Sequence, residues 1–355
     1  MPEHAESAMV AAPPQRLFDV FNGDADGICA LHQLRLASPA DATLVTGVKR
    51  EIDLLRRVPC QAGIEVTVLD ISLDTNLAAL TRLLDAGARV SYYDHHAARH
   101  AFKHPGLRLT WDDAPDICTS LLVDRHLNGR FRPWAIAAAF GDNLDRRARE
   151  LAAKSGFDEH AAAELEALGQ LLNYNAYGDA LADLHVPPET LYRELHAYVD
   201  PFEFIAASPC FRVLADGYHD DASRVAALAP HREWDNGAIY VLPDAPWARR
   251  ISGTFANRLA AERRAASYAV LTESADGSYC VSIRSGAPQA RPANELCARF
   301  AGGGGRRAAG GINALPAASL GAFVDAFSAY FSLASGDVHV ASPSSSSLTR
   351  NTDEC

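Results

Sequence analysis

Positive charge is scarce in this chain. Its 33 lysine and arginine side chains are outnumbered by 44 aspartates and glutamates, which gives a formal net charge of −11 at pH 7. Only Lys49, Lys103 and Lys154 are lysines. A protein with this balance lacks the general positive field that attracts long nucleic acid. A small anion held by a local group of basic side chains is still compatible with the composition.

Patterned cysteines and long apolar runs are also missing. The seven cysteines include no Cys-x-x-Cys pair, and their odd number fits neither a disulfide framework nor a structural zinc site. No segment of about 18 apolar residues occurs, and the first residues show no basic region followed by an apolar stretch. We therefore expect a protein of the reducing cytoplasm, without a signal peptide, a membrane span or a membrane partner.

The length and the composition are those of an ordinary folded protein. The 355 residues are enough for about two domains, at roughly 150 residues per domain. Hydrophobic residues make up 48% and charged residues 22%, which argues against a wholly disordered, collagen-like or coiled-coil chain. No internal repeat is visible.

Strand-like and helix-like segments alternate in the first part of the chain. The patterns predict strands and helices in the order 17–21 (strand), 27–36 (helix), 43–48 and 65–69 (strands), 75–84 (helix) and 89–93 (strand). This alternation is typical of an α/β fold with a parallel, helix-flanked sheet. From about 115 to 198 the pattern is mostly helical. After 236, strands and helices of a smaller α+β domain are expected.

These patterns divide the chain into five parts. The parts are a disordered tail at 1–15, a first domain at 16–198, a connecting region at 199–235, a second domain at 236–333 and a serine-rich disordered tail at 334–355.

Acidic residues follow successive strands of the first domain. Asp24 and Asp26 come after the first strand, Asp70 after the third and Asp94 after the fourth. The carboxyl ends of parallel strands are where ligands bind in such folds. Several carboxylates brought together repel one another unless cations are present. A hard divalent metal is therefore expected.

Two further considerations bear on that metal site. A neutral imidazole from His95 or His96 shifts the preference towards Mn²⁺, Fe²⁺, Co²⁺ or Zn²⁺ and away from Ca²⁺. Each aspartate taken alone is equally well explained as a helix N-cap or a turn former. The order of these residues and their shared place at strand ends favour the metal site.

In these motifs the chain resembles the DHH phosphoesterase superfamily, which is named for the Asp-His-His found here at 94–96. The resemblance runs from Asp24 and Asp26 through Asp70 to Asp142 in the sequence FGDN. It continues in the second half, where VSIRS at 281–285 and GGGGRRAAG at 302–310 look like the DHH-associated C-terminal domain. Nearly all of residues 17–333 are covered.

The resemblance implies Mn²⁺-assisted hydrolysis of phosphoester bonds in a cleft between the two domains. Members of the superfamily include RecJ-type exonucleases, nano-RNases, cyclic-dinucleotide phosphodiesterases and enzymes acting on polyphosphate. His96 is implied as a general acid or phosphate contact, with Asp94 assisting the metal or orienting an imidazole. Asp70 is the implied bridge between two ions. The implied metal ligands are Asp24, Asp26, Asp70, His95 and Asp142.

In the second domain the resemblance implies a substrate-binding surface. Backbone N–H groups of a glycine run can bind an anion, and arginines can clamp a phosphate. A flexible loop and solvent-exposed charge are the ordinary alternatives for these two patterns. The implied substrate-binding residues are Arg284, Ser285, Gly303, Gly304, Gly305, Arg306 and Arg307.

Two positions depart from the family pattern. Val20 stands where the first motif usually has a histidine, so one of the two metal sites is expected to be weak. Gly305 stands where the second domain usually has a histidine, and Arg306 is the candidate replacement.

These expectations lead to one function and two alternatives. We expect an Mn²⁺-dependent phosphodiesterase that converts very short oligonucleotides, in particular dinucleotides with a 5′ phosphate, to mononucleotides. The acidic charge and the two-domain length favour this small substrate over long nucleic acid. The alternatives are a phosphohydrolase acting on polyphosphate or another nucleotide phosphoester, and a nucleotide-binding sensor with weakened catalysis. The sequence leaves the oligomeric state open, a homodimer included.

Overall fold

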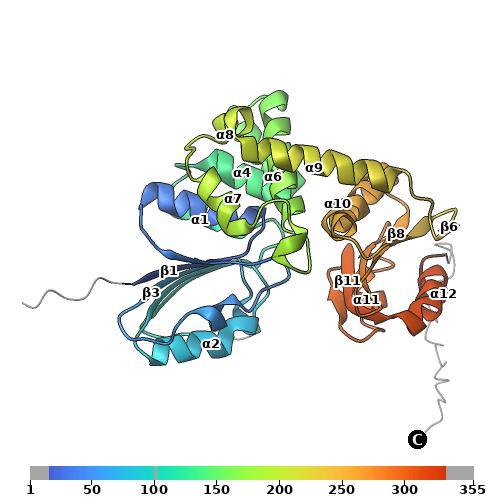
Figure 1. Ribbon diagram of the computed structural model, residues 1–355, viewed down its shortest axis with the longest axis horizontal. Helices are drawn as coiled ribbons and strands as arrows, with labels where there is room; N and C mark the ends of the chain where they lie inside the picture. Colours follow the sequence, from blue (N-terminus) through green and yellow to red (C-terminus); the bar gives the residue numbers. More distant parts are fainter. Residues whose placement is uncertain (1–15, 100–101, 333–355) are drawn as a thin grey trace, which may run out of the picture.

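The chain forms two domains, each built on its own β-sheet (Figure 1). The computed structural model describes residues 16–99 and 102–332. Both expected tails, 1–15 and 334–355, therefore lie outside the described residues. No helix in the described ranges is long and apolar enough to cross a membrane.

The first domain contains a five-stranded, fully parallel sheet with the order β2-β1-β3-β4-β5. The strands are β1 (Leu17–Phe21), β2 (Thr43–Val45), β3 (Glu65–Leu69), β4 (Arg89–Asp94) and β5 (Leu107–Trp111). Phe21 is paired with Leu69, and Leu69 with Tyr93. This register brings the carboxyl ends of β1, β3 and β4 to the same edge of the sheet, as the sequence predicts. The expected parallel sheet is confirmed.

Helices cover both faces of this sheet (Figure 1). In that view α2 (Leu73–Asp85) lies below the sheet, and most other helices of the domain lie above it. The upper helices are α1 (Ala25–Ala37), α3 (Thr119–His126), α4 (Arg132–Gly141), α5 (Asp145–Lys154), α6 (Glu159–Asn175) and α7 (Pro188–Leu195). Short 3₁₀ helices occur at Leu54–Arg57 and Leu181–Asp183.

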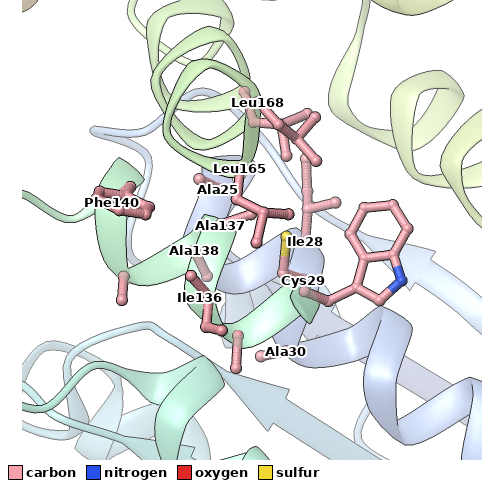
Figure 2. Packing of buried hydrophobic residues seen from close by; sticks show 14 of the residues in the cluster. Ala25, Ile28, Cys29, Ala30, Ile136, Ala137, Ala138, Phe140, Leu165 and Leu168 are labelled. Atoms are coloured by element: carbon pink, nitrogen blue, oxygen red, sulfur yellow. The ribbon is translucent and has the colours of Figure 1, made fainter. Parts of the chain in front are cut away.

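Alternate residues of the strands supply the two cores. Val20 and Val68 face the α2 side, where they pack with apolar residues such as Leu80. Phe21 and Leu69 face the other side and pack with α1, α4 and α6. Figure 2 shows the small side chains of α1 and α4 and the leucines of α6 that form the centre of this second core. The period-two alternation of a strand thus separates two apolar layers.

The region 199–235, expected to connect the domains, is largely helical. It contains α8 (Pro201–Ala207), α9 (Pro209–Ala226) and the short strand β6 (Arg232–Trp234). Both helices begin with proline, which is favoured at the first helical position because its missing N–H needs no partner there. α9 packs against α6 of the first domain and α10 of the second, and so spans the junction (Figure 1).

The second domain has a six-stranded mixed sheet with the order β10-β11-β9-β8-β7-β6. Only β7 and β8 among these neighbours pair in parallel. Its elements are β7 (Gly237–Leu242), α10 (Pro246–Glu262), β8 (Ser267–Glu273), β9 (Ser278–Arg284), α11 (Ala293–Cys297), β10 (Gly303–Gly305), β11 (Ala309–Pro316), the 3₁₀ helix Ala317–Ser319 and α12 (Leu320–Ser332). The expected α+β domain is confirmed, and its glycine run forms the edge strand β10.

Buried ion pairs join the domains at α10. Arg250 donates to Asp221 of α9 at 2.9 Å, and Tyr174 of α6 also donates to that carboxylate. The neighbouring Arg249 makes a two-pronged contact with Asp183, at 2.8 and 2.9 Å. Bidentate arginine–carboxylate pairs fix orientation as well as distance. α10 is therefore held in a defined position against the first domain.

Candidate metal centre

The turn between β1 and α1 carries the first two acidic residues. Asp24 is the N-cap of α1, and its Oδ1 accepts the N–H groups of Asp26 at 3.1 Å and Gly27 at 3.2 Å. A Cβ atom on Gly27 would lie 2.2 Å from the carbonyl oxygen of Asn22, so only glycine fits this close approach. The helix-capping explanation is thus correct for Asp24. Its second oxygen contacts the ammonium group of Lys49.

Asp26 lies in the first turn of α1 and is buried. Its two oxygens accept the backbone N–H groups of Ser120 and Thr119, both at 2.7 Å, from the start of α3. Burial, together with the negative charge of Asp70, raises the pKa of Asp26 to about 7. The carboxylate is held in place but has no cation of its own.

Asp70 follows β3 and has an unusual backbone. Its φ is +59°, in the left-handed region that residues other than glycine seldom adopt. Such strain concentrates at functional sites and persists only where the surroundings enforce it. Thr119 donates its hydroxyl to Asp70 Oδ1 at 3.2 Å. Burial and the charge of Asp24 raise the pKa of Asp70 to about 6.

His95 is the point at which the acidic residues meet. Its Nε2 lies 3.4 Å from Asp70 Oδ1, 3.9 Å from Asp26 Oδ2 and 3.8 Å from Asp142 Oδ2. Its Nδ1 faces the carbonyl oxygen of Ile117 at 2.9 Å. A proton on Nδ1 leaves the Nε2 lone pair directed at the carboxylates. Burial opposes the charged form of His95, but Asp70 and the other carboxylates raise its pKa to about 10.

Asp142 reaches the centre because two helices approach very closely. It follows α4, and a Cβ on the preceding Gly141 would lie 2.4 Å from the Cβ of Ala25 in α1. Its Oδ2 is buried and has no hydrogen-bond partner among the described residues. A buried carboxylate oxygen without a partner is costly, and burial raises the pKa of Asp142.

This donor set fits a divalent cation. Three carboxylates and one imidazole nitrogen converge, and a cation bound among them would give Asp142 Oδ2 the partner that it lacks among the described residues. Oxygen ligands with one imidazole suit Mn²⁺ and similar ions. The residues that would hold the ion are Asp26, Asp70, His95 and Asp142.

Asp94 and His96 form a separate pair beside this centre. Asp94 is fully buried, and its Oδ1 accepts the ring N–H of His96 at 2.7 Å and the backbone N–H of His95 at 2.9 Å. Its Oδ2 accepts the N–H of Leu73 at the start of α2 at 3.2 Å. Burial opposes the charged form of His96, but Asp94 raises its pKa. Asp94 therefore orients His96 and the strand end, and its oxygens are taken up by these N–H groups. His96 can also join Asp70 and His95, since one ligand atom of each lies within 4.8 Å of the others.

Three residues of this site lie outside the motifs that the sequence shows. Lys49 contacts Asp24, Asn173 accepts from Lys49 at 2.7 Å, and Thr119 contacts Asp70. Thr119 and Ser120 follow Cys118 at the start of a predicted helical region, which is a helix-start signal. Lys49 is one of only three lysines. For Asn173, inside a helix, no sequence signal points to the site.

Of the candidate substrate-binding residues in the second domain, Arg284 is connected to the metal centre by hydrogen bonds, whereas Ser285 supports a turn. Arg284 donates to Asn257 at 2.7 Å, and Asn257 donates to Asn143, which follows Asp142, at 2.6 Å. This chain of contacts connects Arg284 to the metal centre. The hydroxyl of Ser285 donates to the carbonyl oxygen of Arg291 at 2.6 Å and supports a turn.

Within the described residues, neither the glycine run nor the arginines that follow it contact the carboxylates of the metal centre. Gly303, Gly304 and Gly305 pair with β11, which leaves the other side of this edge strand without a strand neighbour. Arg307 donates to the carbonyl oxygen of Gln289 at 2.7 Å. Arg306 is exposed. Their binding role stays a prediction.

Comparisons with known proteins bear on the fold. No protein-family model matches the sequence, and a search of curated proteins finds no match. Among solved structures, exonuclease RecJ bound to manganese is similar, with a TM-score of 0.59 and 20% identity over 90% of each chain. RecJ from Thermus thermophilus with Mn²⁺ has a TM-score of 0.54 and 19% identity, over 90% of this chain and 52% of that chain.

A third similar structure is matched over almost its whole length. It is PggH, a pGpG-specific phosphodiesterase from Vibrio cholerae, with a TM-score of 0.53 and 14% identity over 90% of this chain and 99% of that chain.

These likenesses define the class of fold as a parallel α/β domain followed by a mixed-sheet domain. Within this class the chain has a two-domain fold similar to those of RecJ and PggH.

Proposed function

We propose that the protein is an Mn²⁺-dependent phosphodiesterase that hydrolyses very short oligonucleotides, in particular dinucleotides, to mononucleotides. The observation that carries this proposal is the position of His95 Nε2, which lies within 3.9 Å of carboxylate oxygens of Asp26, Asp70 and Asp142. These groups come from four separate segments of the chain. A divalent cation held by them supplies Lewis-acid stabilisation of the charge that develops on phosphoryl oxygens.

The chain's own groups have distinct tasks in this proposal. Asp26 is fixed by two backbone N–H groups and Asp70 by Thr119, so the ligands are preorganised before a cation binds. His96, oriented by Asp94, is available to give a proton to the leaving oxygen or to contact a phosphate. Arg284, positioned by Asn257, is the proposed phosphate clamp from the second domain.

Three observations support a small substrate. The net charge of −11 opposes binding of long nucleic acid through a general positive field. The ion pairs at α10 hold the two domains in one arrangement, with the arginine of one domain connected to the carboxylates of the other. The similar structure of PggH belongs to an enzyme described as specific for pGpG. We place the reaction in the cytoplasm, with the oligonucleotide as the only partner required.

The proposal is tested by a substrate panel measured during an Mn²⁺ titration. The panel contains 5′-phosphorylated dinucleotides, a longer oligonucleotide, a cyclic dinucleotide and polyphosphate. We expect the highest kcat/KM on dinucleotides, with activity absent when the metal is chelated. Faster hydrolysis of polyphosphate would support the alternative phosphohydrolase. Nucleotide binding without turnover of any substrate would support the sensor.

A further inference from the structure

Lys49 is an unusual side chain for this site because it lies among the carboxylates and is firmly positioned. Its ammonium group contacts Asp24 and donates to Asn173 Oδ1 at 2.7 Å. The same nitrogen lies 5.5 Å from the centre of the Tyr177 ring. Its backbone N–H donates to the carbonyl oxygen of Ala176 at 2.9 Å. The side chain is 24% exposed, so the contact with Asp24 is largely shielded from solvent.

The hydrogen bonds of Asp24 use both of its carboxylate oxygens. Oδ1 accepts two backbone N–H groups at the start of α1, and Oδ2 accepts from Lys49. Asp142, by contrast, keeps a buried oxygen without a partner among the described residues. Asp24 therefore has an ammonium group in direct contact, whereas Asp26, Asp70 and Asp142 share the single imidazole of His95.

Position 20 offers no ligand to a second ion. Val20 is fully buried and packs in the apolar core on the α2 side of the sheet. Asn22, on the same face of the strand, directs its Nδ2 to the carbonyl oxygen of Lys49 at 3.5 Å. The neighbouring residues thus hold the lysine, and Asn22 Oδ1, which is buried without a hydrogen-bond partner among the described residues, is a neutral oxygen that adds no negative charge for a second ion.

We propose that the ammonium group of Lys49 takes the place of a second metal ion beside Asp24, so that the protein works with one divalent cation, bound by Asp26, Asp70, His95 and Asp142. This inference rests on the proposed function. Lys49 then supplies a fixed positive charge at the point where a two-ion enzyme has a metal. The fixed charge of Lys49 also explains why Val20 can replace the histidine of the family pattern while the three carboxylates around His95 are retained.

The test is the Mn²⁺ stoichiometry, measured by calorimetry and by electron paramagnetic resonance, which distinguishes an isolated Mn²⁺ from a coupled pair. We expect one isolated ion per chain in the wild-type protein and in the charge-preserving control Lys49→Arg. In Lys49→Met, Asp24 loses its counter-charge, so we expect a second, weaker ion coupled to the first. In the double variant Asp24→Asn/Lys49→Met we expect one ion again, because Asn keeps the helix-capping acceptor and removes the unpaired charge.

Each other outcome has a definite meaning. Two coupled ions in the wild-type protein would overturn the role of Lys49 and leave the proposed hydrolase intact. A single ion in Lys49→Met would show that the lysine does not exclude a second metal. No bound ion in the folded wild-type protein would overturn the metal centre, and the proposed function with it. If Lys49→Met does not fold, the double variant Asp24→Asn/Lys49→Met tests the proposal instead. One bound ion in the double variant would support the proposal. Loss of that ion would show that Asp24 is a metal ligand and would contradict the proposal.

Discussion

His95 directs its Nε2 to Asp70 Oδ1 at 3.4 Å, although the two residues follow different strands. The parallel pairing of Leu69 with Tyr93 places the ends of β3 and β4 level, and this register is what brings them together. Without a metal ion, a proton on His95 is the positive charge that Asp26, Asp70 and Asp142 share. The site is therefore poised to exchange protons for a metal ion.

The first prediction concerns that exchange. The pKa is about 7 for Asp26, about 6 for Asp70 and about 10 for His95 in the cation-free protein. Below these values the groups hold protons that a cation must displace, so Mn²⁺ affinity should rise as Asp70 and Asp26 lose their protons between about pH 5 and pH 8, and should continue to rise towards pH 10 as His95 loses its proton. Calorimetry in buffers of different ionisation enthalpy would measure both the affinity and the protons released. An affinity independent of pH, with no proton release, would contradict this account of the site.

The second prediction separates His96 from the metal ligands. His96→Gln removes the imidazole that Asp94 orients, so kcat should fall by about 10²-fold or more, the usual contribution of a general acid. Mn²⁺ affinity should change little. The exposed His219 offers a control, since His219→Gln should leave both quantities unchanged. Loss of metal from His96→Gln would instead make His96 a ligand.

The third prediction places substrate binding in the second domain. Arg284→Ala should lower kcat/KM, with a loss of transition-state stabilisation of about 1.5 to 3 kcal/mol, the usual value of a hydrogen bond to a charged group. The metal content should be unchanged. Asn257→Ala should lower it in the same direction by less, because the guanidinium loses the side chain that positions it. Steady-state kinetics with metal analysis would decide. Unchanged kinetics in Arg284→Ala would mean that the arginine does not bind substrate.

The fourth prediction concerns the domain junction. Asp221→Asn breaks the buried pair with Arg250 and should lower the free energy of unfolding by about 3 kcal/mol. Arg146 and Glu150 form an exposed pair in α5, so Arg146→Gln is the matched control, with an expected change below about 0.5 kcal/mol. Denaturant unfolding of both variants gives the comparison. Equal effects would show that the buried pair does not stabilise the junction.

Much of the fold could be predicted from the sequence because it depends on local periodicity. The strands at 17–21 and 65–69 were predicted with their observed bounds, since each is short, apolar and followed by a turn signal. β5 was missed because it is an edge strand with a half-exposed pattern that carries little periodic signal. β10 was not predicted as a strand because glycine has low strand propensity, and only its pairing with β11 makes it one.

The site could be predicted less completely. The strand-end rule located Asp70 and His95, and the structure brings both together with Asp26 and Asp142. The contact between Lys49 and Asp24 could not be predicted, because it depends on how the chain after β2 folds over α6. No local pattern encodes such a tertiary contact. The same reason applies to Asn257, whose role depends on the docking of α10.

The most direct test of the central claim is the initial rate of dinucleotide hydrolysis at saturating Mn²⁺ for the wild-type protein and Asp70→Ala. Asp70 Oδ1 lies nearest to His95 Nε2 of the three carboxylate oxygens that converge on that atom, so the loss of Asp70 should disorganise the centre. The expected loss in rate is about 10³-fold or greater. Asp113→Ala, at an exposed aspartate, should retain the wild-type rate. A rate above about a tenth of wild type in folded Asp70→Ala would contradict the proposed metal centre.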